Sequence, residues 1–137
     1  MSTIKTNTLT GTTSAGVINV TGEGGSTTTN LQSGLAKQWV NMNGSGTVAV
    51  TDSFNNTSMT DNGTGNYSTT ITNNMNNSTY AIPTGGAFDE DSASAYALQG
   101  AASLGKSTSS YTVHCGSNTT SAMDWEYVVG CILGDIA

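Results

Sequence analysis

The densest group of residues that could carry chemistry is the run Asp89, Glu90 and Asp91. Carboxylates bind calcium when they alternate along a loop and further oxygen ligands follow at set positions. Three consecutive acids do not have that spacing, and no series of ligands flanks them. We therefore interpret this run as a solvated loop and predict no metal site in the chain.

A second group of carboxylates, Asp124 and Glu126, brackets Trp125. Residues two apart on a strand share one face, so this pair would stand opposite the tryptophan. Glycosidases use two carboxyl groups that act on one bond from different sides. Neighbours on one exposed strand are more typical of a polar surface, and we predict no catalytic residue here.

The possible nucleophiles also lack partners. His114 is the single histidine, and it adjoins Cys115, so the two side chains would point to opposite faces of a strand. Cys115 and Cys131 are each in phase with apolar residues two and four positions earlier, which predicts two small core residues on inward faces. We expect reduced thiols, and a disulfide stays open if the two strands are neighbours.

No cofactor-binding residue is predicted. The run GEGG at residues 22–25 lacks the lysine and the strand-to-helix setting of a phosphate loop, so we interpret it as a linker. Nothing in the sequence supports an enzyme. The aromatic residues are mostly in strand phase, which predicts core or interface positions, although one or two at loop edges would be placed to stack on sugars. They are Trp39, Tyr67, Tyr80, Tyr96, Tyr111, Trp125 and Tyr127.

The composition favours strands. Of the 137 residues only 9% are charged, while Thr, Ser, Asn and Gly supply about half of the chain. These side chains suit turns and exposed strand faces and depress helix propensity. Disorder is the competing interpretation of such a composition, and it stays open for the part before about residue 36.

The charge balance excludes some partners. Three Lys, no Arg and nine acidic residues leave a net charge of −6 and no basic surface, so we exclude nucleic acid. The longest apolar run, residues 127–133, is far shorter than the roughly 20 residues of a membrane helix. The opening MSTIKTNTLT has no apolar run after Lys5, so we expect no signal peptide. We expect no membrane partner and synthesis in the cytoplasm.

The segment of residues 59–71, MTDNGTGNYSTTI, carries the most specific local signal. Asp61, Asn62 and Gly63 favour a tight turn, and Tyr67, Thr69 and Ile71 then alternate with smaller polar residues, which predicts a hairpin. Its polar tip is expected to face solvent. Further strands are predicted at residues 36–42, 47–51, 54–59, 67–72, 79–82, 110–116 and 124–133, the last of them central because it is almost continuously apolar.

The predicted fold is therefore all-β: an antiparallel, jelly-roll-like β-sandwich at residues 35–137, preceded by an extended N-terminal arm at residues 1–34. The arm has few large apolar residues. Strand-like pieces at residues 3–9 and 16–21 precede the glycine-rich run, and residues 31–37 form one helical turn or a linker. The segment 92–98 is a strand or a short helix. Such an arm becomes ordered only against another chain. Because uncharged edge strands aggregate unless they are covered, we also expect a homo-oligomer.

Residues 36–82 resemble a β-rich domain of structural proteins from marine tailed bacteriophages, including cyanophages. The opening STIKTNTLT and the stretch GVINVTGEGGSTTTNLQSGLAKQW at residues 16–39 resemble the N-terminal segments of the same virion proteins. The resemblance weakens between residues 85 and 110. No catalytic residue is carried over from it.

This resemblance implies a virion protein: a homotrimeric surface fibre or tail-tip protein, anchored to other virion proteins through residues 1–30, with the β-domain pointing outward. A capsid decoration protein, as a head knob or short head fibre, is the alternative. A module that binds a host surface glycan is a second alternative.

Overall fold

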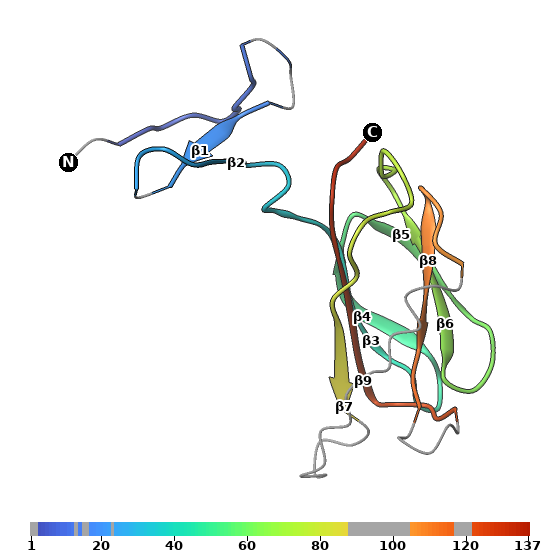
Figure 1. The fold of residues 1–137 in the computed structure, drawn as a ribbon. Coiled ribbons are helices and arrows are strands. Elements are labelled where there is room, and N and C mark those ends of the chain that lie inside the picture. The colour runs from blue at the N-terminus through green and yellow to red at the C-terminus, as the bar shows by residue number, and fades with distance from the viewer. Residues whose placement is uncertain (1–2, 13, 15–16, 23, 88–104, 117–121) are drawn as a thin grey trace. The chain divides into compact units, whose positions relative to one another are not determined.

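The computed structural model describes residues 3–12, 14, 17–22, 24–87, 105–116 and 122–137. Within these residues the chain forms nine strands and no helix (Figure 1), which confirms the all-β prediction. The chain divides into two units, Met1–Leu35 and Ala36–Ala137. Each is described here by itself.

The first unit contains one short hairpin. Strand β1 (Asn19–Thr21) pairs antiparallel with β2 (Thr28–Asn30). The turn between them is closed by the Gly22 backbone N–H, which donates to the Thr27 carbonyl at 2.8 Å. The linker prediction for this glycine-rich run was therefore wrong, because the glycines build a turn. No strand forms at residues 3–9, where the described Ile4 side chain is 84% exposed.

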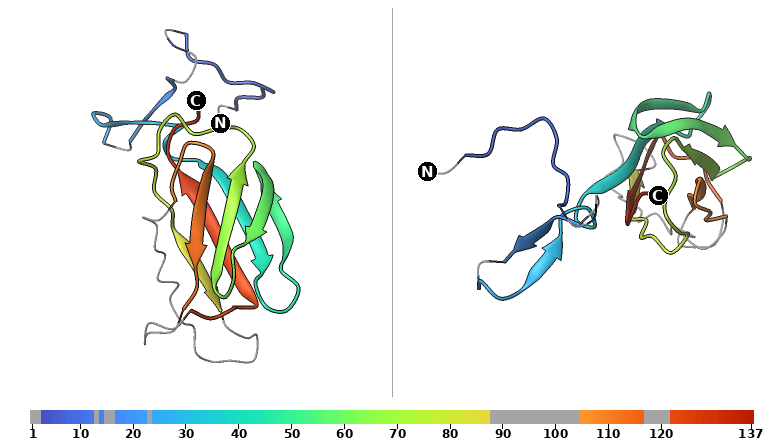
Figure 2. Two further views of the ribbon diagram at one scale, coloured as in Figure 1. Left: turned by 90° about the vertical axis from the view of Figure 1, so that its right-hand side faces the viewer. Right: turned by 90° about the horizontal axis from the view of Figure 1, so that it is seen from above.

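The described residues of the second unit form two antiparallel sheets, compatible with a β-sandwich. Figures 1 and 2 show the two sheets as facing layers. The jelly-roll connectivity stays a prediction. The four-stranded sheet has the order β4-β3-β9-β7, with β3 at Ala36–Asn43, β4 at Ala49–Phe54, β7 at Thr84–Ala87 and β9 at Tyr127–Leu133. The three-stranded sheet has the order β5-β6-β8, with β5 at Asn56–Asp61, β6 at Asn66–Ile71 and β8 at Ser110–His114.

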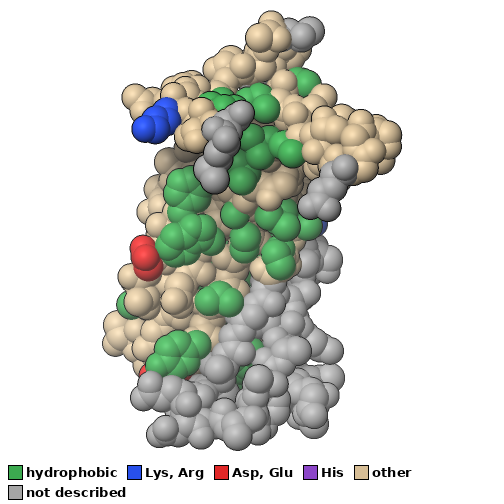
Figure 3. All heavy atoms as spheres, turned by 90° about the vertical axis from the view of Figure 1, so that its left-hand side faces the viewer, with side chains coloured by type: hydrophobic (Ala, Val, Ile, Leu, Met, Phe, Trp, Pro, Cys, Tyr) green, Lys and Arg blue, Asp and Glu red, His purple; other side chains and the backbone are tan. Residues whose placement is uncertain are grey.

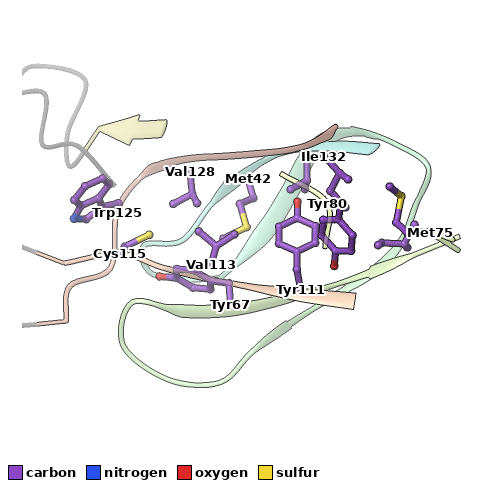
Figure 4. Packing of buried hydrophobic residues seen from close by; sticks show 12 residues of the cluster. Met42, Tyr67, Met75, Tyr80, Tyr111, Val113, Cys115, Trp125, Val128 and Ile132 are labelled. Atoms are coloured by element: carbon purple, nitrogen blue, oxygen red, sulfur yellow. The ribbon is translucent and has the colours of Figure 1, made fainter. Parts of the chain in front are cut away.

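The core lies between the two sheets (Figure 4). Alternate residues of each inner strand point inward, as the period of two requires. The Tyr111 hydroxyl donates to Gln38 Oε1 at 2.8 Å, which gives this buried amide a partner from the opposite sheet. The largest fully buried apolar side chains are Trp125, Tyr67, Tyr111, Met42, Met75, Ile132, Val40, Val113 and Val128.

A single residue, Asn55, carries the chain from β4 in one sheet to β5 in the other. It has a φ of 54°, in the left-handed region that asparagine adopts more readily than most residues. Its Nδ2 donates to the Lys37 carbonyl at 2.7 Å, and its Oδ1 accepts from the Asn73 backbone N–H at 2.8 Å. The strand predicted at residues 54–59 was expected to begin at Phe54, which was wrong. Phe54 is the last residue of β4, and β5 begins at Asn56.

Several predicted strands are confirmed. The hairpin predicted within residues 59–71 is formed by β5 and β6, and its residues Asp61–Thr64 are exposed. Strand β9 lies between β3 and β7, so it is central as predicted. The strand predicted at 79–82 is reduced to a bridge between Ala81 and Leu133. Pairing resumes in β7, where Gly85 and Gly86 pair with β9. The segment 92–98 lies outside the described residues.

Candidate interaction surface

The two sheets present outward faces of different chemistry. On the three-stranded sheet, the outward residues form cross-strand rows of hydroxyls. Ser58 pairs with Thr70, which pairs with Ser110, and Thr60 pairs with Ser68, which pairs with Thr112. The Ser68 and Thr112 hydroxyl oxygens lie 3.1 Å apart. This face is polar and uncharged, as expected of a solvated strand surface.

The outward face of the four-stranded sheet is apolar instead. Four large apolar side chains on it are well exposed: Phe54 at 52%, Val129 at 41%, Tyr127 at 39% and Leu133 at 37%. With the half-buried Trp39 and Cys131 they make up the outward apolar face. Figure 3 shows this side of the molecule, where hydrophobic side chains gather. Contiguous apolar patches of this kind mark interaction sites on soluble proteins.

The strand register arranges these side chains in rows. Trp39 on β3 pairs with Phe54 on one side and with Cys131 on the other, so the three form one row across β4, β3 and β9. In the next row, Asn41 lies between Asp52 and Val129. Directly paired residues share a face, so both rows point away from the core. Asp52 is the acidic residue of these rows and sits on edge strand β4.

A hollow of about 510 Å³ opens on this face beside the central strands. Its walls come from β3, from β9 and from Pro83, which precedes β7. Its apolar lining includes Trp39, Val129 and Cys131, and Asn41 lies among them. Phe54 is not part of the lining but stands on the far side of Trp39. The face therefore has an exposed aromatic side chain on β4, next to a concave area over β3 and β9.

The cysteine prediction is half correct. Cys115 is a buried core residue beyond β8, and burial raises the pKa of its thiol to about 12, with the nearby Asp124 carboxylate adding to the shift. Cys131 was predicted to face inward, but it lies on the outward apolar face. Cys131 does share a strand face with Val129, as predicted, but that face of β9 points outward. Both thiols are free, and they belong to segments of different sheets.

Asp124 and Glu126 do not lie on one strand face, although this was predicted. Both precede β9 and lie outside any strand. Asp124 Oδ1 accepts from the Gly65 backbone N–H at 2.7 Å and from the Tyr67 hydroxyl at 2.8 Å. Burial, and then the hydrogen bond to Asp124, raises the pKa of Tyr67. The carboxylate thus ties the tip of the β5–β6 hairpin to the segment before β9, while Trp125 is fully buried.

The remaining positions considered for chemistry are His114 and the acidic run at residues 89–91. His114 is half-buried on the outward face of β8, opposite Asn66, as predicted for a strand residue. The acidic run at residues 89–91 lies outside the described residues. Across the described part of the chain, no group of His, Cys, Asp and Glu is placed to hold a metal ion. No helix of these same residues is long and apolar enough to cross a membrane.

Sequence reasoning did not identify the outward apolar face. The nearly continuous apolar run of β9 was the available signal, since a strand with one solvated face should alternate.

A scan of family models and searches of curated proteins and of solved structures find no match to this chain. The geometry described above is therefore the basis for the functional proposal.

Proposed function

We propose that this protein is a non-enzymatic structural protein of a tailed-bacteriophage virion. In this proposal it is a homotrimeric surface fibre or tail-tip protein that attaches through its N-terminal unit and directs the β-domain outward. The observation that carries the proposal is the outward apolar face, because a sheet face this apolar is suited to permanent burial in an assembly. The exposed apolar side chains of the N-terminal unit, among them Ile4 and Leu9, also support this proposal, because they too are suited to burial in an assembly.

The resemblance of residues 36–82 to phage structural domains supplies the setting for this assembly. Head decoration is the alternative position on the particle. A second candidate function is recognition of a host surface glycan. It is favoured by the exposed polar tip at Asp61–Thr64, whose amide and hydroxyl groups suit a polyhydroxylated ligand.

Deletion of residues 1–35 tests the attachment. We expect the remaining sandwich to stay folded, because its core residues all lie within Ala36–Ala137. It should fail to join particles, whereas the full chain is recovered in purified particles in multiples of three. Normal incorporation of the truncated chain would contradict the anchoring role. Absence of the full chain from purified particles would contradict the virion role altogether.

A glycan array probed with the full chain tests the second candidate. Binding that is lost in an Asn62→Ala, Thr64→Ala double variant would support recognition by the tip. No binding on any glycan would leave assembly as the better-supported role.

A further inference from the structure

We infer that the outward apolar face of the four-stranded sheet is the surface through which copies of this chain associate. In this arrangement Phe54 of one copy enters the hollow beside Trp39 and Cys131 of the next. This inference rests on the proposed homotrimer. It adds which face makes the contact between copies, and it names Phe54 and the hollow as the two parts that meet.

The size of the face fits a contact between proteins. Phe54, Tyr127, Val129 and Leu133 are 37 to 52% exposed. Together with the half-buried Trp39 and Cys131, they present on the order of 400 Å² of apolar area. Apolar atoms supply roughly 60% of a typical interface, so such a patch fits about 700 Å² per copy. A stable interface buries about 800 Å² on each partner. The patch is therefore large enough to be the centre of a contact between two copies.

The chemistry of the face favours a second copy over a charged partner. The rows of Trp39 and Asn41 across β4, β3 and β9 contain one acidic residue, Asp52, and no Lys or Arg, and Lys37 of β3 is buried. A partner selected by charge would require complementary groups that these rows lack. A surface that is mainly apolar is matched by another copy of itself.

The face also contains both halves of a contact. Phe54, with 52% of its area exposed, is the most exposed large apolar side chain described in residues 36–137. The hollow begins on the neighbouring strand β3, where Trp39, the residue that pairs with Phe54, forms part of its wall. If Phe54 of one copy enters the hollow of the next, the contact can repeat around a cyclic oligomer, or two copies can exchange it reciprocally in a dimer. Aromatic anchors seated in pockets carry most of the energy of such interfaces.

A cysteine at position 54 provides a direct test, because Cys131 is already in the hollow. Phe54 and Cys131 pair with Trp39 from opposite sides, so their Cα atoms lie roughly 10 Å apart within one copy. Disulfides require a Cα separation below about 7 Å. A disulfide between positions 54 and 131 can therefore form only between copies. We expect mild oxidation of the full-length Phe54→Cys variant to give this linkage, identified by peptide mass mapping.

Matched variants define the outcomes. The linkage should disappear in a Phe54→Cys, Cys131→Ser double variant. Thr60→Cys, on the polar outward face of the other sheet, should not link to Cys131. Phe54→Asp should lower the sedimentation-derived mass of the oligomer at least twofold at a given concentration. Linkage of Cys131 to Val20→Cys, in place of position 54, would assign the face to the N-terminal unit and overturn the inference.

The failures of the inference and of the proposed function are distinguishable. An oligomer that persists in Phe54→Asp, with no linkage from position 54, overturns the assigned face but leaves the homotrimer in place. A wild-type chain that sediments as a monomer overturns both. Linkage between copies of a chain that is absent from purified particles supports the interface and contradicts the virion role.

Discussion

At the scale of single residues, the Tyr111 hydroxyl lies in space that Gly130 leaves open. A Cβ at position 130 would come within 2.6 Å of this hydroxyl oxygen. The same hydroxyl donates to Gln38 Oε1 across the core. Burial raises the pKa of Tyr111 to about 12, so the donor keeps its proton at neutral pH. One small residue on β9 therefore permits the polar contact that joins the two sheets.

We predict that Gly130→Ala and Tyr111→Phe are not additive. Gly130→Ala alone should lower the free energy of unfolding by about 1 to 3 kcal/mol through overpacking. In a Tyr111→Phe background the cost should fall by at least about 1 kcal/mol, since the ring carbons are 3.3 Å or more from the added Cβ. Chemical denaturation of the four proteins measures the coupling. Additive costs would contradict the assigned close approach.

At the scale of elements, the tip of the β5–β6 hairpin is held at Gly65. Its carbonyl accepts from the Cys115 backbone N–H at 2.7 Å, and its own N–H donates to Asp124. Gly65 has a φ of 64° and would place a Cβ 2.3 Å from the Cys115 carbonyl oxygen. Gly46, in the β3–β4 turn, has a φ of 65° but open space where its Cβ would lie.

This pair of glycines separates backbone strain from steric contact. Both alanine variants should lose about 1 kcal/mol or more from the left-handed conformation. Gly65→Ala should cost at least about 2 kcal/mol beyond Gly46→Ala, because rigid backbone has to move. Melting temperatures and denaturant midpoints of the two variants provide the measurement. Equal losses would show that the hairpin tip is free to shift.

The elements also show what sequence reasoning can reach. The hairpin of β5 and β6 was predicted because its turn residues act locally, within a few positions of Gly63. Strand β7 was not predicted. Its glycines form a strand because β9, which is remote in the sequence, supplies the hydrogen-bonding partner. The face of Cys131 was assigned wrongly for a similar reason. Alternation gives the phase of a strand, whereas the direction of the core depends on which sheet covers it.

At the scale of the whole molecule, the core holds ionisable groups in their neutral, protonated form. Burial raises the pKa of the Cys115 thiol from 9.0 to about 12 and that of the Tyr111 hydroxyl from 10.0 to about 12. The unfolded chain releases these protons at lower pH than the folded chain does. Their contribution to stability is therefore complete below about pH 9 and is lost as the pH rises toward 12.

We therefore predict a melting temperature that falls steadily above about pH 9, as followed by circular dichroism between pH 7 and 11. Cys115→Ala should reduce the slope between pH 9 and 10, where the thiol is the first of the two groups to ionise in the unfolded chain. A buried thiol contributes on the order of 1 kcal/mol per pH unit in this range. A melting temperature that stays constant to pH 11 would contradict the prediction.

The hydroxyl rows on the three-stranded sheet have a consequence for the solvent in which the protein can work. Surface ion pairs weaken as salt rises, since the Debye length shrinks from about 10 Å at 0.1 M to about 3 Å at 1 M. Ser68 and Thr112 interact through neutral hydroxyls, and only 9% of the chain is charged. Dissolved salt therefore has few charge–charge interactions to screen on the outward face of this sheet. The folded sandwich should keep its stability from dilute buffer to concentrated brine.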